Sequence, residues 1–155
     1  MSENDIITVL DGAVKLAQIS GALRTSSDAV LLAAACPANA GHHILDLGCG
    51  VGTAGLCTLQ RINNTQLTGI DIQADHIDIA LKNAALNNNT HRCTFIACDI
   101  KDYDQTGFDH AICNPPYEGA GQHLDMIDKK LVFLLEPAKR GPGGTVWFSE
   151  RSTEP

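Results

Sequence analysis

Residues 44–52, which read ILDLGCGVG, join a short apolar run to three glycines that alternate with other residues. Glycine lets the backbone turn tightly and approach a ligand at points where a Cβ atom would clash. The next residues, 53–62 (TAGLCTLQRI), are expected to form a helix whose first N–H groups have no partner within the helix. A strand, a glycine loop and a helix in this order predict a ligand site at the end of the strand.

Strand and helix patterns alternate along the chain around this loop. The clearest helix pattern, residues 74–88, places four apolar side chains on one face, namely Ile77, Ala80, Leu81 and Ala84. Strands are predicted at 42–48, 66–72, 93–100, 108–114 and 143–150, and further helices at 53–62 and 123–138. This alternation predicts an α/β fold with a mostly parallel sheet and helices on both faces. Right-handed crossovers then place the strand ends on one edge, where ligands bind.

The first part of the chain has a different pattern. Residues 6–19 place Asp11-Gly12 between alternating apolar residues, which predicts a small hairpin. Residues 24–37 indicate a helix, with Ser27 or Asp28 as its cap and Pro37 at its end. We therefore expect residues 1–155 to form a single domain, with the hairpin and helix in 1–37 and the α/β core in 38–155.

Composition is typical of a globular protein with one core. The chain has 155 residues, of which 44% are hydrophobic, and contains no apolar run near the roughly 20 residues that span a bilayer. Its first ten residues, MSENDIITVL, lack the basic region of a secretory signal, which predicts a cytoplasmic protein. A net charge of -7 argues against broad, nonspecific binding of nucleic acid, although it leaves room for a local patch or a second subunit.

Cysteine and histidine spacing gives no sign of crosslinks or metal. The six cysteines form no Cys-x-x-Cys pair, and most lie in apolar stretches, so we expect free thiols. The six histidines are scattered without the spacing of metal ligands. We expect neither a disulfide framework nor a metal site.

Acidic residues end the next two strands on the same edge. Asp71 lies 21 residues after Gly50 and is placed to accept hydrogen bonds from both hydroxyls of a ribose. Asp99 follows the third strand, where an adenine amino group can donate to it. A glycine loop and two acidic positions in this arrangement predict a ligand that contains adenosine.

The identity of that ligand depends on Asp46. Gly50, Gly52 and Gly55 also form a literal G-x-G-x-x-G, which is typical of nicotinamide dinucleotides. However, a pyrophosphate would meet the negative charge of Asp46, whereas the amino and sulfonium groups of S-adenosylmethionine are cationic. The chain also has no Tyr-x-x-x-Lys pair of a nicotinamide-dependent oxidoreductase. The sequence therefore favours S-adenosylmethionine as the cofactor.

The fourth strand ends at Asn114-Pro115-Pro116-Tyr117. Methyl transfer to a planar amino nitrogen makes this nitrogen cationic in the transition state, and two acceptors aimed at its hydrogens would stabilise the charge. The side-chain oxygen of Asn114 and the carbonyl of Pro115 can serve as these acceptors. Pro116 stiffens the turn together with Pro115, and Tyr117 offers a flat face on which a flipped base can stack.

The motifs ILDLGCGVG, GIDI, ACDI and NPPY, in this order and spacing, resemble those of class I S-adenosylmethionine-dependent methyltransferases. The resemblance implies a Rossmann-like fold and an N-methyltransferase whose catalytic residues are Asn114, Pro115, Pro116 and Tyr117. The implied cofactor contacts are Asp46, Gly48, Cys49 and Gly50 along the methionine part, Asp71 and Ile72 at the ribose, and Asp99 and Ile100 around the adenine, together with Arg24 and Asn114.

Residues 11–56 resemble the bacterial methyltransferases that modify adenine N6 in a tRNA anticodon loop. In that group a hairpin and a helix precede the glycine loop, and the matching helix residues are Arg24, Asp28, Ala29, Leu32 and Ala33. The resemblance implies an RNA substrate, most simply tRNA, and places Arg24 over the cofactor. Because NPPY also accompanies methylation of cytosine N4 and glutamine N5, a glutamine N5 protein methyltransferase stays open, as does an inactive cofactor-binding partner subunit.

The resemblance ends after Tyr117. Such enzymes usually have a longer loop after NPPY and two more strands after the fifth, and the sequence indicates that these last two strands are lacking. The fifth strand would then form an exposed sheet edge, and exposed edges favour pairing with another chain. A homodimer or a complex with a partner subunit through this edge is therefore predicted.

Overall fold

The computed structural model describes residues 5–19, 27–114, 133–135, 139–140 and 146–147. The helices in this part of the chain are α1 (Ser27–Ala35), α2 (Thr53–Arg61), α3 (Ala74–Leu86), η1 (Thr90–Arg92) and η2 (Ile100–Asp102). The strands are β1 (Ile6–Val9), β2 (Val14–Ala17), β3 (His43–Leu47), β4 (Gln66–Asp71), β5 (Cys93–Ala97), β6 (His110–Cys113), β7 (Phe133–Leu135), β8 (Lys139–Arg140) and β9 (Val146–Trp147). No helix among the described residues is long and apolar enough to cross a membrane.

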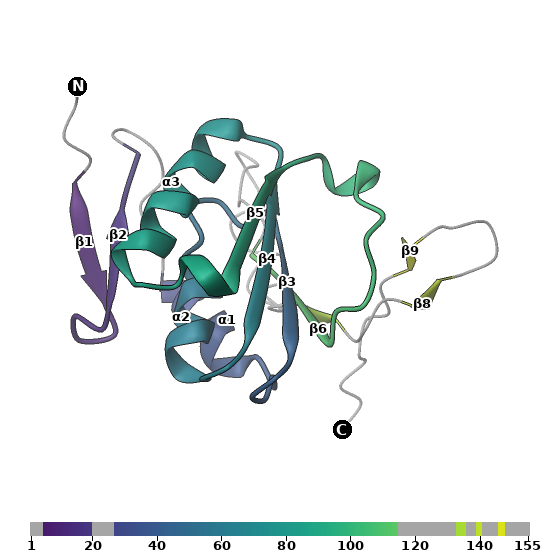
Figure 1. Cartoon of the computed structure of the whole chain (residues 1–155), viewed down its shortest axis with the longest axis horizontal. Helices are drawn as coiled ribbons and strands as arrows, with labels where there is room; N and C mark the ends of the chain where they lie inside the picture. The colour runs from purple at the N-terminus through teal and green to yellow at the C-terminus, as the bar shows by residue number, and fades with distance from the viewer. Residues whose placement is uncertain (1–4, 20–26, 115–132, 136–138, 141–145, 148–155) are drawn as a thin grey trace, which may run out of the picture.

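The central sheet has the strand order β5-β4-β3-β6-β7 (Figure 1). Strands β3 to β6 pair in parallel, and β7 runs antiparallel to β6. The order reverses at β3, because the chain moves outward to β4 and β5 and then returns to the other side of β3 with β6. Ligands of open α/β sheets bind at such a reversal, outside the carboxyl ends of the strands. The topology confirms the predicted Rossmann-like α/β fold.

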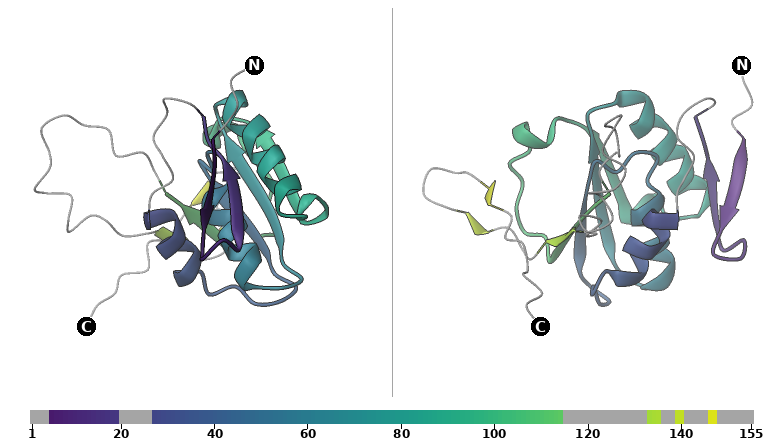
Figure 2. Two further views of the ribbon diagram at one scale, coloured as in Figure 1. Left: turned by 90° about the vertical axis from the view of Figure 1, so that its left-hand side faces the viewer. Right: turned by 180° about the vertical axis from the view of Figure 1, so that it is seen from behind.

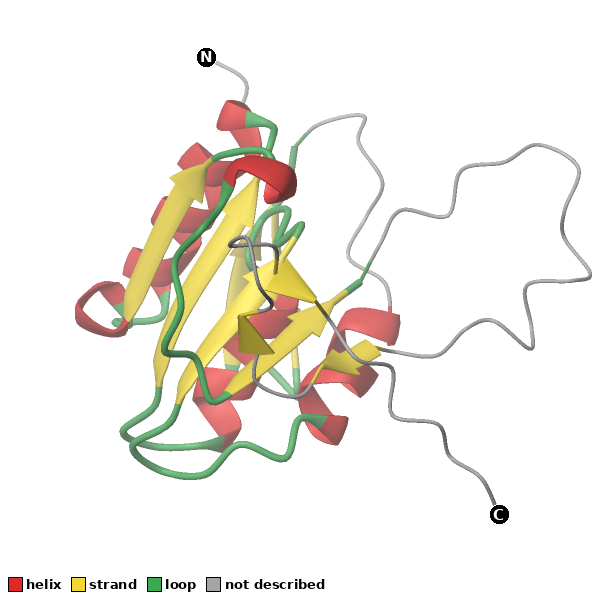
Figure 3. Ribbon diagram, turned by 90° about the vertical axis from the view of Figure 1, so that its right-hand side faces the viewer, coloured by secondary structure: helices red, strands yellow, loops and turns green. Residues whose placement is uncertain are grey.

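The two faces of the sheet are covered by different kinds of structure. Helices α1, α2 and α3 lie on one face of the sheet (Figure 3). They bury alternate strand side chains, including Ile44, Leu67 and Ile112. On the opposite face, a smaller apolar cluster that includes Leu45 and Ile70 packs against the segment between β5 and β6. Thus all three α-helices that the structure describes lie on one face. Most of the helix predicted at 123–138, which would cover the other face, lies outside the described residues.

The predictions for the last two elements were wrong where the structure describes them. Residues 133–135, placed in a predicted helix, form strand β7 against the free side of β6. A short apolar run such as this one fits a buried helix or a strand equally well, and the open side of β6 supplies backbone partners. Residues 146–147, expected in the fifth strand of the sheet, pair with β8 in a separate two-stranded ribbon.

The amino-terminal predictions agree with the structure with one adjustment. The predicted hairpin is formed by β1 and β2, which pair antiparallel around a loop that contains Asp11 and Gly12 at positive φ. Helix α1 begins at Ser27 and ends two residues before Pro37. Ser27 and Asp28 therefore lie in the first turn of the helix rather than before it, and the residues that precede them are outside the described part.

The hairpin of β1 and β2 lies beside α3 (Figure 2), where Asn83 of α3 and Asn87, its C-terminal cap, hold it against the core. The Asn83 side chain accepts the Ala17 N–H at 2.6 Å and donates to the Ala17 carbonyl at 3.1 Å, and Asn87 bonds both backbone groups of Lys15 at 2.9 and 2.7 Å. Positions four apart on a helix and two apart on a strand are both spaced by about 6 to 7 Å, so the two side chains match alternate strand residues. The asparagine pair thus substitutes for a neighbouring strand.

This contact explains why one face of α3 was predicted incorrectly. The apolar spacing placed Leu81 in the core, but its side chain is 44% exposed, whereas Asn83 is fully buried. A buried amide is tolerated when its donors and acceptors are bonded, as those of Asn83 are. Ile77, Ala80 and Ala84 lie in the core as predicted.

Candidate cofactor-binding site

The glycine loop between β3 and α2 leaves open space at the carboxyl edge of the sheet. Gly48 and Gly50 have φ values of +66° and +53°, and a Cβ atom built on either one would meet no atom of the described residues within 4 Å. At Gly52, with φ +86°, a Cβ atom would lie 3.2 Å from the Phe95 ring. Gly52 is thus needed for packing, whereas the backbone at Gly48 and Gly50 borders space that a ligand can fill.

Asp46 lies beneath this loop at the end of β3. It is 1% exposed, and one carboxyl oxygen accepts the Gly55 N–H at 3.2 Å. Burial raises the pKa of Asp46 to about 7, the Gly55 hydrogen bond opposes this rise, and the charge of Asp71 adds to it. No cationic side chain among the described residues contributes to the pKa of this carboxyl group. A cation bound beside it would restore the ionised form, so the site fits an ammonium group and not a phosphate.

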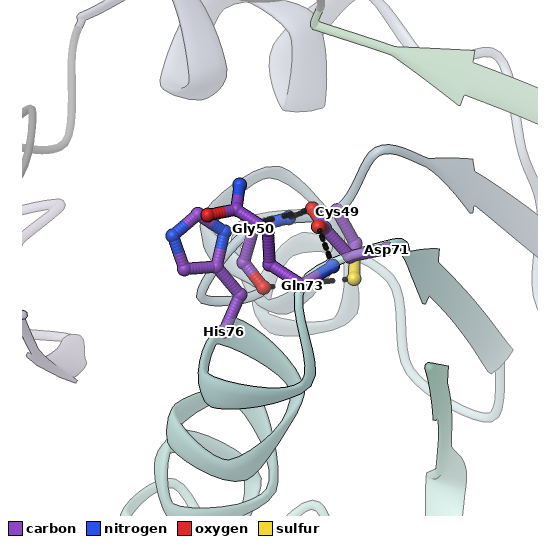
Figure 4. A network of polar contacts seen from close by, with 5 residues as sticks. All are labelled: Cys49, Gly50, Asp71, Gln73 and His76. Atoms are coloured by element: carbon purple, nitrogen blue, oxygen red, sulfur yellow. Dashed lines mark hydrogen bonds and ion pairs between the residues drawn. The ribbon is translucent and has the colours of Figure 1, made fainter. Parts of the chain in front are cut away.

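Asp71 at the end of β4 connects the glycine loop to α3 (Figure 4). One carboxyl oxygen accepts the Gly50 N–H at 2.8 Å, and the other accepts the Gln73 N–H at 2.9 Å. A carboxylate oxygen accepts more than one hydrogen bond, so both oxygens keep capacity for a ligand. Two acceptors on one rigid carboxylate match the two neighbouring hydroxyls of a ribose.

His76, a site residue that sequence reasoning missed, lies beside Asp71 (Figure 4). Its Nδ1 atom is 3.7 Å from a carboxyl oxygen of Asp71 and is buried without a hydrogen-bond partner in the described structure. His76 belongs to the first turn of α3, which begins three residues after β4 ends. That proximity to a strand end was the only signal in the sequence, because a single histidine on a helix has no motif.

The part of the site predicted to hold the adenine combines Asp99 with two exposed apolar side chains. Ile72 directly follows Asp71 and is 68% exposed, and Ile100 directly follows Asp99 and is 42% exposed. The ends of β4 and β5 are neighbours, because the Cys98 N–H donates to the Asp71 carbonyl at 2.9 Å. One Asp99 oxygen accepts the Lys101 N–H at 2.9 Å and caps η2. Exposed apolar side chains beside a carboxylate suit a flat heterocycle with an amino group.

Asn114 follows β6, which neighbours β3 on the side away from β4, and lies level with the start of the glycine loop. Cys113 pairs with Leu47 in the parallel register, so Asn114 and Gly48 leave the sheet side by side. Asn114 is half-buried. The other predicted residues of this part of the site, Arg24, Pro115, Pro116 and Tyr117, lie outside the described residues.

The cysteines next to the site are not placed to act as nucleophiles. Burial raises the pKa of Cys113 to about 11, with the charge of Asp46 adding to the rise. Burial also raises the pKa of Cys49, far above its ordinary value. The thiolate is the reactive form of cysteine, so both side chains stay protonated near neutral pH. Cys49 instead contributes its backbone, whose N–H donates to the Ile70 carbonyl.

The glycine loop is also held from the hairpin side. The same Asn83 amide that bonds Ala17 donates to the Val51 carbonyl at 2.9 Å. One fully buried side chain therefore joins the amino-terminal hairpin, helix α3 and the loop that borders the site. A second hollow, of about 450 Å³, lies on the sheet face opposite the helices, next to His43 and Tyr103, and none of the predicted site residues lines it.

The fold and the carboxyl edge of the sheet are those expected of a methyltransferase, and comparisons with known proteins confirm this class. The family model of the methyltransferase small domain matches residues 22–148. The chain therefore belongs to the methyltransferase small domain family.

Relatives within this class carry more particular names. A tRNA1(Val) (adenine(37)-N6)-methyltransferase of Shewanella sediminis is 33% identical over 138 residues, which cover 77% of this chain and 56% of the relative. A relative with the same name from a Flavobacteriaceae bacterium is 36% identical and covers 61% of this chain and 41% of its own. The ribosomal RNA large subunit methyltransferase G of Pseudoalteromonas translucida is 33% identical over 57% of this chain and 24% of its own. The chain thus spans about half or less of these relatives.

Solved structures share the fold. An S-adenosylmethionine-dependent methyltransferase from Geobacter sulfurreducens, solved in complex with S-adenosyl-L-homocysteine, superposes with a TM-score of 0.51 at 28% identity and covers 57% of this chain and 36% of its own. The Pyrococcus abyssi tRNA (uracil-54, C5)-methyltransferase gives a TM-score of 0.61 over 82% of this chain and 31% of its own. At 22% identity, this second likeness concerns the fold alone.

Proposed function

We propose that this domain binds S-adenosylmethionine and transfers its methyl group to the N6 amino nitrogen of an adenine in tRNA. The observation that carries the proposal is the placement of Asp46, buried with a raised pKa, beneath an open glycine loop, with Asn114 level with Gly48 on the next strand. The names of the relatives support the substrate class. Cytoplasmic location, a single domain and a dimer or partner subunit stay predictions.

The cofactor contacts follow from the chemistry of each residue. The Asp46 carboxylate would hold the ammonium group of the methionine part, and the backbone from Gly48 to Gly50 would lie along it. Asp71 would accept the ribose hydroxyls, and Ile72 would cover one side of the sugar and base. Asp99 would accept the adenine amino group with Ile100 against the ring. When bound, the cofactor supplies an electrophilic methyl group on a sulfonium.

The methyl acceptor would be held by Asn114. Its side-chain oxygen would accept a hydrogen bond from the exocyclic amino group and stabilise the positive charge that develops on the nitrogen. The predicted roles of Pro115, Pro116 and Tyr117, as second acceptor, rigid turn and stacking face, complete this arrangement. The acidic net charge of -7 means that RNA would be held by a local surface and not by the whole protein.

Two assays test the proposal. Isothermal titration calorimetry with S-adenosylhomocysteine and NAD should show binding of the first ligand alone. Transfer of a labelled methyl group to unmodified tRNA, followed by nuclease digestion and mass spectrometry, should yield N6-methyladenosine. At saturating cofactor, Asn114→Ala should lose at least about 100-fold in rate, the usual effect of removing one group that stabilises transition-state charge.

The matched control is Asn63→Ala, because Asn63 is exposed in the loop between α2 and β4. This variant should methylate tRNA as the unaltered protein does. Binding of NAD without S-adenosylhomocysteine would overturn the cofactor assignment. Equal methyl incorporation by the Asn114→Ala and Asn63→Ala proteins would remove Asn114 from the mechanism.

A further inference from the structure

The buried Nδ1 atom of His76 is a polar group whose partner is missing from the described structure. Buried nitrogen and oxygen atoms in folded proteins nearly always have a hydrogen-bond partner, so an unpaired one calls for a physical explanation. The histidine side chain is 23% exposed, so the ring borders solvent although this atom does not. Its position beside Asp71, at the ribose end of the proposed cofactor site, suggests what the partner is.

The distance between His76 and Asp71 fits a shared hydroxyl group. Nδ1 and the Asp71 oxygen are 3.7 Å apart, which is too far for a direct hydrogen bond. One hydroxyl oxygen can nevertheless lie about 2.8 Å from both atoms once the partly exposed histidine ring turns enough to uncover Nδ1. A hydroxyl donates one hydrogen bond and accepts others, so it can donate to the carboxylate and accept from an imidazole N–H at the same time.

The surrounding contacts keep both groups in place for such a ligand. Backbone N–H groups of Gly50 and Gln73 bind the two Asp71 oxygens and fix the carboxylate. The backbone N–H of His76 donates to the Gln73 carbonyl at 3.1 Å, which holds the histidine in the first turn of α3. Since the carboxylate already has these partners, a role for His76 as its main support is not needed.

We propose that His76 is a specificity-determining residue of the cofactor site, whose Nδ1–H donates to the same ribose hydroxyl that donates to Asp71. The inference rests on the proposed binding of an adenosyl cofactor and goes beyond it by assigning a second ligand to the sugar. The residue makes the site selective for a ribose over a deoxyribose at one hydroxyl position.

Calorimetry with three ligands tests this role. The ligands are S-adenosylhomocysteine and its 2′-deoxy and 3′-deoxy analogues, and the proteins are the unaltered chain, His76→Ala and His76→Asn. His76→Ala should weaken S-adenosylhomocysteine about fivefold, the loss expected for one ordinary hydrogen bond, and should leave the affinity for one of the two deoxy analogues unchanged. His76→Asn should restore most of the affinity, because its amide carries a donor near the place of Nδ1.

Two controls separate this role from a structural one and from failure of the proposed function. His91→Ala, at an exposed position in η1, should bind all three ligands as the unaltered protein does. The unliganded His76→Ala and His76→Asn proteins should melt at similar temperatures, because the Nδ1 position has no hydrogen-bond partner among the described residues before ligand binds. Equal affinities of the unaltered and His76→Ala proteins for all three ligands, or an equal loss for all three, would overturn the inference. Failure of the unaltered protein to bind S-adenosylhomocysteine would instead contradict the proposed function.

Discussion

The two ends of the parallel strands differ in how completely their polar groups are bonded. At the amino-terminal end, the Arg92 guanidinium donates to the carbonyls of Leu59, Ile62 and Thr65 at 3.2, 2.7 and 2.9 Å. At the carboxyl-terminal end, the buried Asp46 carboxyl accepts one hydrogen bond from the described residues, and the buried Nδ1 atom of His76 has no hydrogen-bond partner among them. One end is held together by the protein itself, and the other leaves capacity for a ligand.

The difference indicates that the amino-terminal strand ends contribute to stability and the carboxyl-terminal strand ends to ligand binding. The carboxyl-terminal end of helix α1 is also bound on this side of the sheet, at the amino-terminal ends of the strands. There Arg61 donates to the carbonyls of Ala33 and Cys36. Bonds from a charged donor to several carbonyls stabilise the loops between elements without serving a ligand. Buried carboxylates at the opposite end cost stability in the unliganded protein. Substitutions at the two ends should therefore have opposite effects on stability.

The largest effect is expected for Asp46→Asn. The pKa of Asp46 is raised to about 7 from 3.8, so the folded state holds its proton more tightly and stability from this group is lost as pH rises from about 4 to about 7. At pH 8 the free energy of unfolding of Asp46→Asn should exceed that of the unaltered protein by on the order of 4 kcal/mol. The asparagine oxygen can still accept the Gly55 N–H.

Urea unfolding at several pH values, together with calorimetry, measures both sides of this effect. The stability difference between Asp46→Asn and the unaltered protein should close as pH falls to about 4. Affinity for S-adenosylhomocysteine should fall at least about tenfold, because a charged hydrogen bond to its ammonium is lost. A variant that is less stable at pH 8 would contradict the contrast between the two ends.

A smaller effect of opposite sign is expected for Arg92→Ala. Removing the guanidinium takes a donor from three carbonyls at the end of α2 and in the loop before β4, and the free energy of unfolding should fall by about 2 to 3 kcal/mol. Chemical denaturation at pH 7 gives this value, with the exposed Lys82→Ala as control. Affinity for S-adenosylhomocysteine, measured well below the melting temperature, should stay within about twofold of the unaltered protein. A large loss of affinity would show that the two ends are not independent.

The smallest effect is expected at a histidine pair formed by His42, which precedes β3, and His110, the first residue of β6. His42 Nδ1 and His110 Nε2 are 3.0 Å apart, and burial, followed by the nearby His42, lowers the pKa of His110, while Asp109 acts in the opposite direction. Stability from His110 is present above its unfolded pKa of about 6.5 and is lost as pH falls through the folded value. His110→Gln should therefore lose less stability than the unaltered protein between pH 7 and pH 5.

Urea unfolding of His110→Gln and of the exposed control His91→Gln over this pH range tests the sign. The direction is opposite to that for Asp46, whose stability contribution falls as pH rises. If the two histidine variants respond to acid alike, the pair of His42 and His110 does not contribute to the pH dependence of stability.

Much of the fold followed from local patterns in the sequence. The glycine loop after β3 and Asp71 at the end of β4 were predicted correctly, because buried parallel strands are short apolar runs and their ends coincide with polar residues. The short run at residues 133–135 was misassigned, since its pairing depends on the free side of β6, a partner distant in sequence. Leu81 was predicted in the core but is exposed, because the contact with the hairpin buries Asn83 instead.

The sequence determined the order of strands and α-helices from β1 to β6 and the kinds of side chain at these strand ends, because periodicity and glycine spacing are local properties of the chain. Tertiary structure alone decided that Asn83 joins the hairpin to Val51, that Asn114 stands beside Gly48, and that His76 lies 3.7 Å from Asp71. These contacts join segments through the register of the sheet and the packing of α3. Spacing in a sequence does not specify such distances, because they depend on how all the elements pack together.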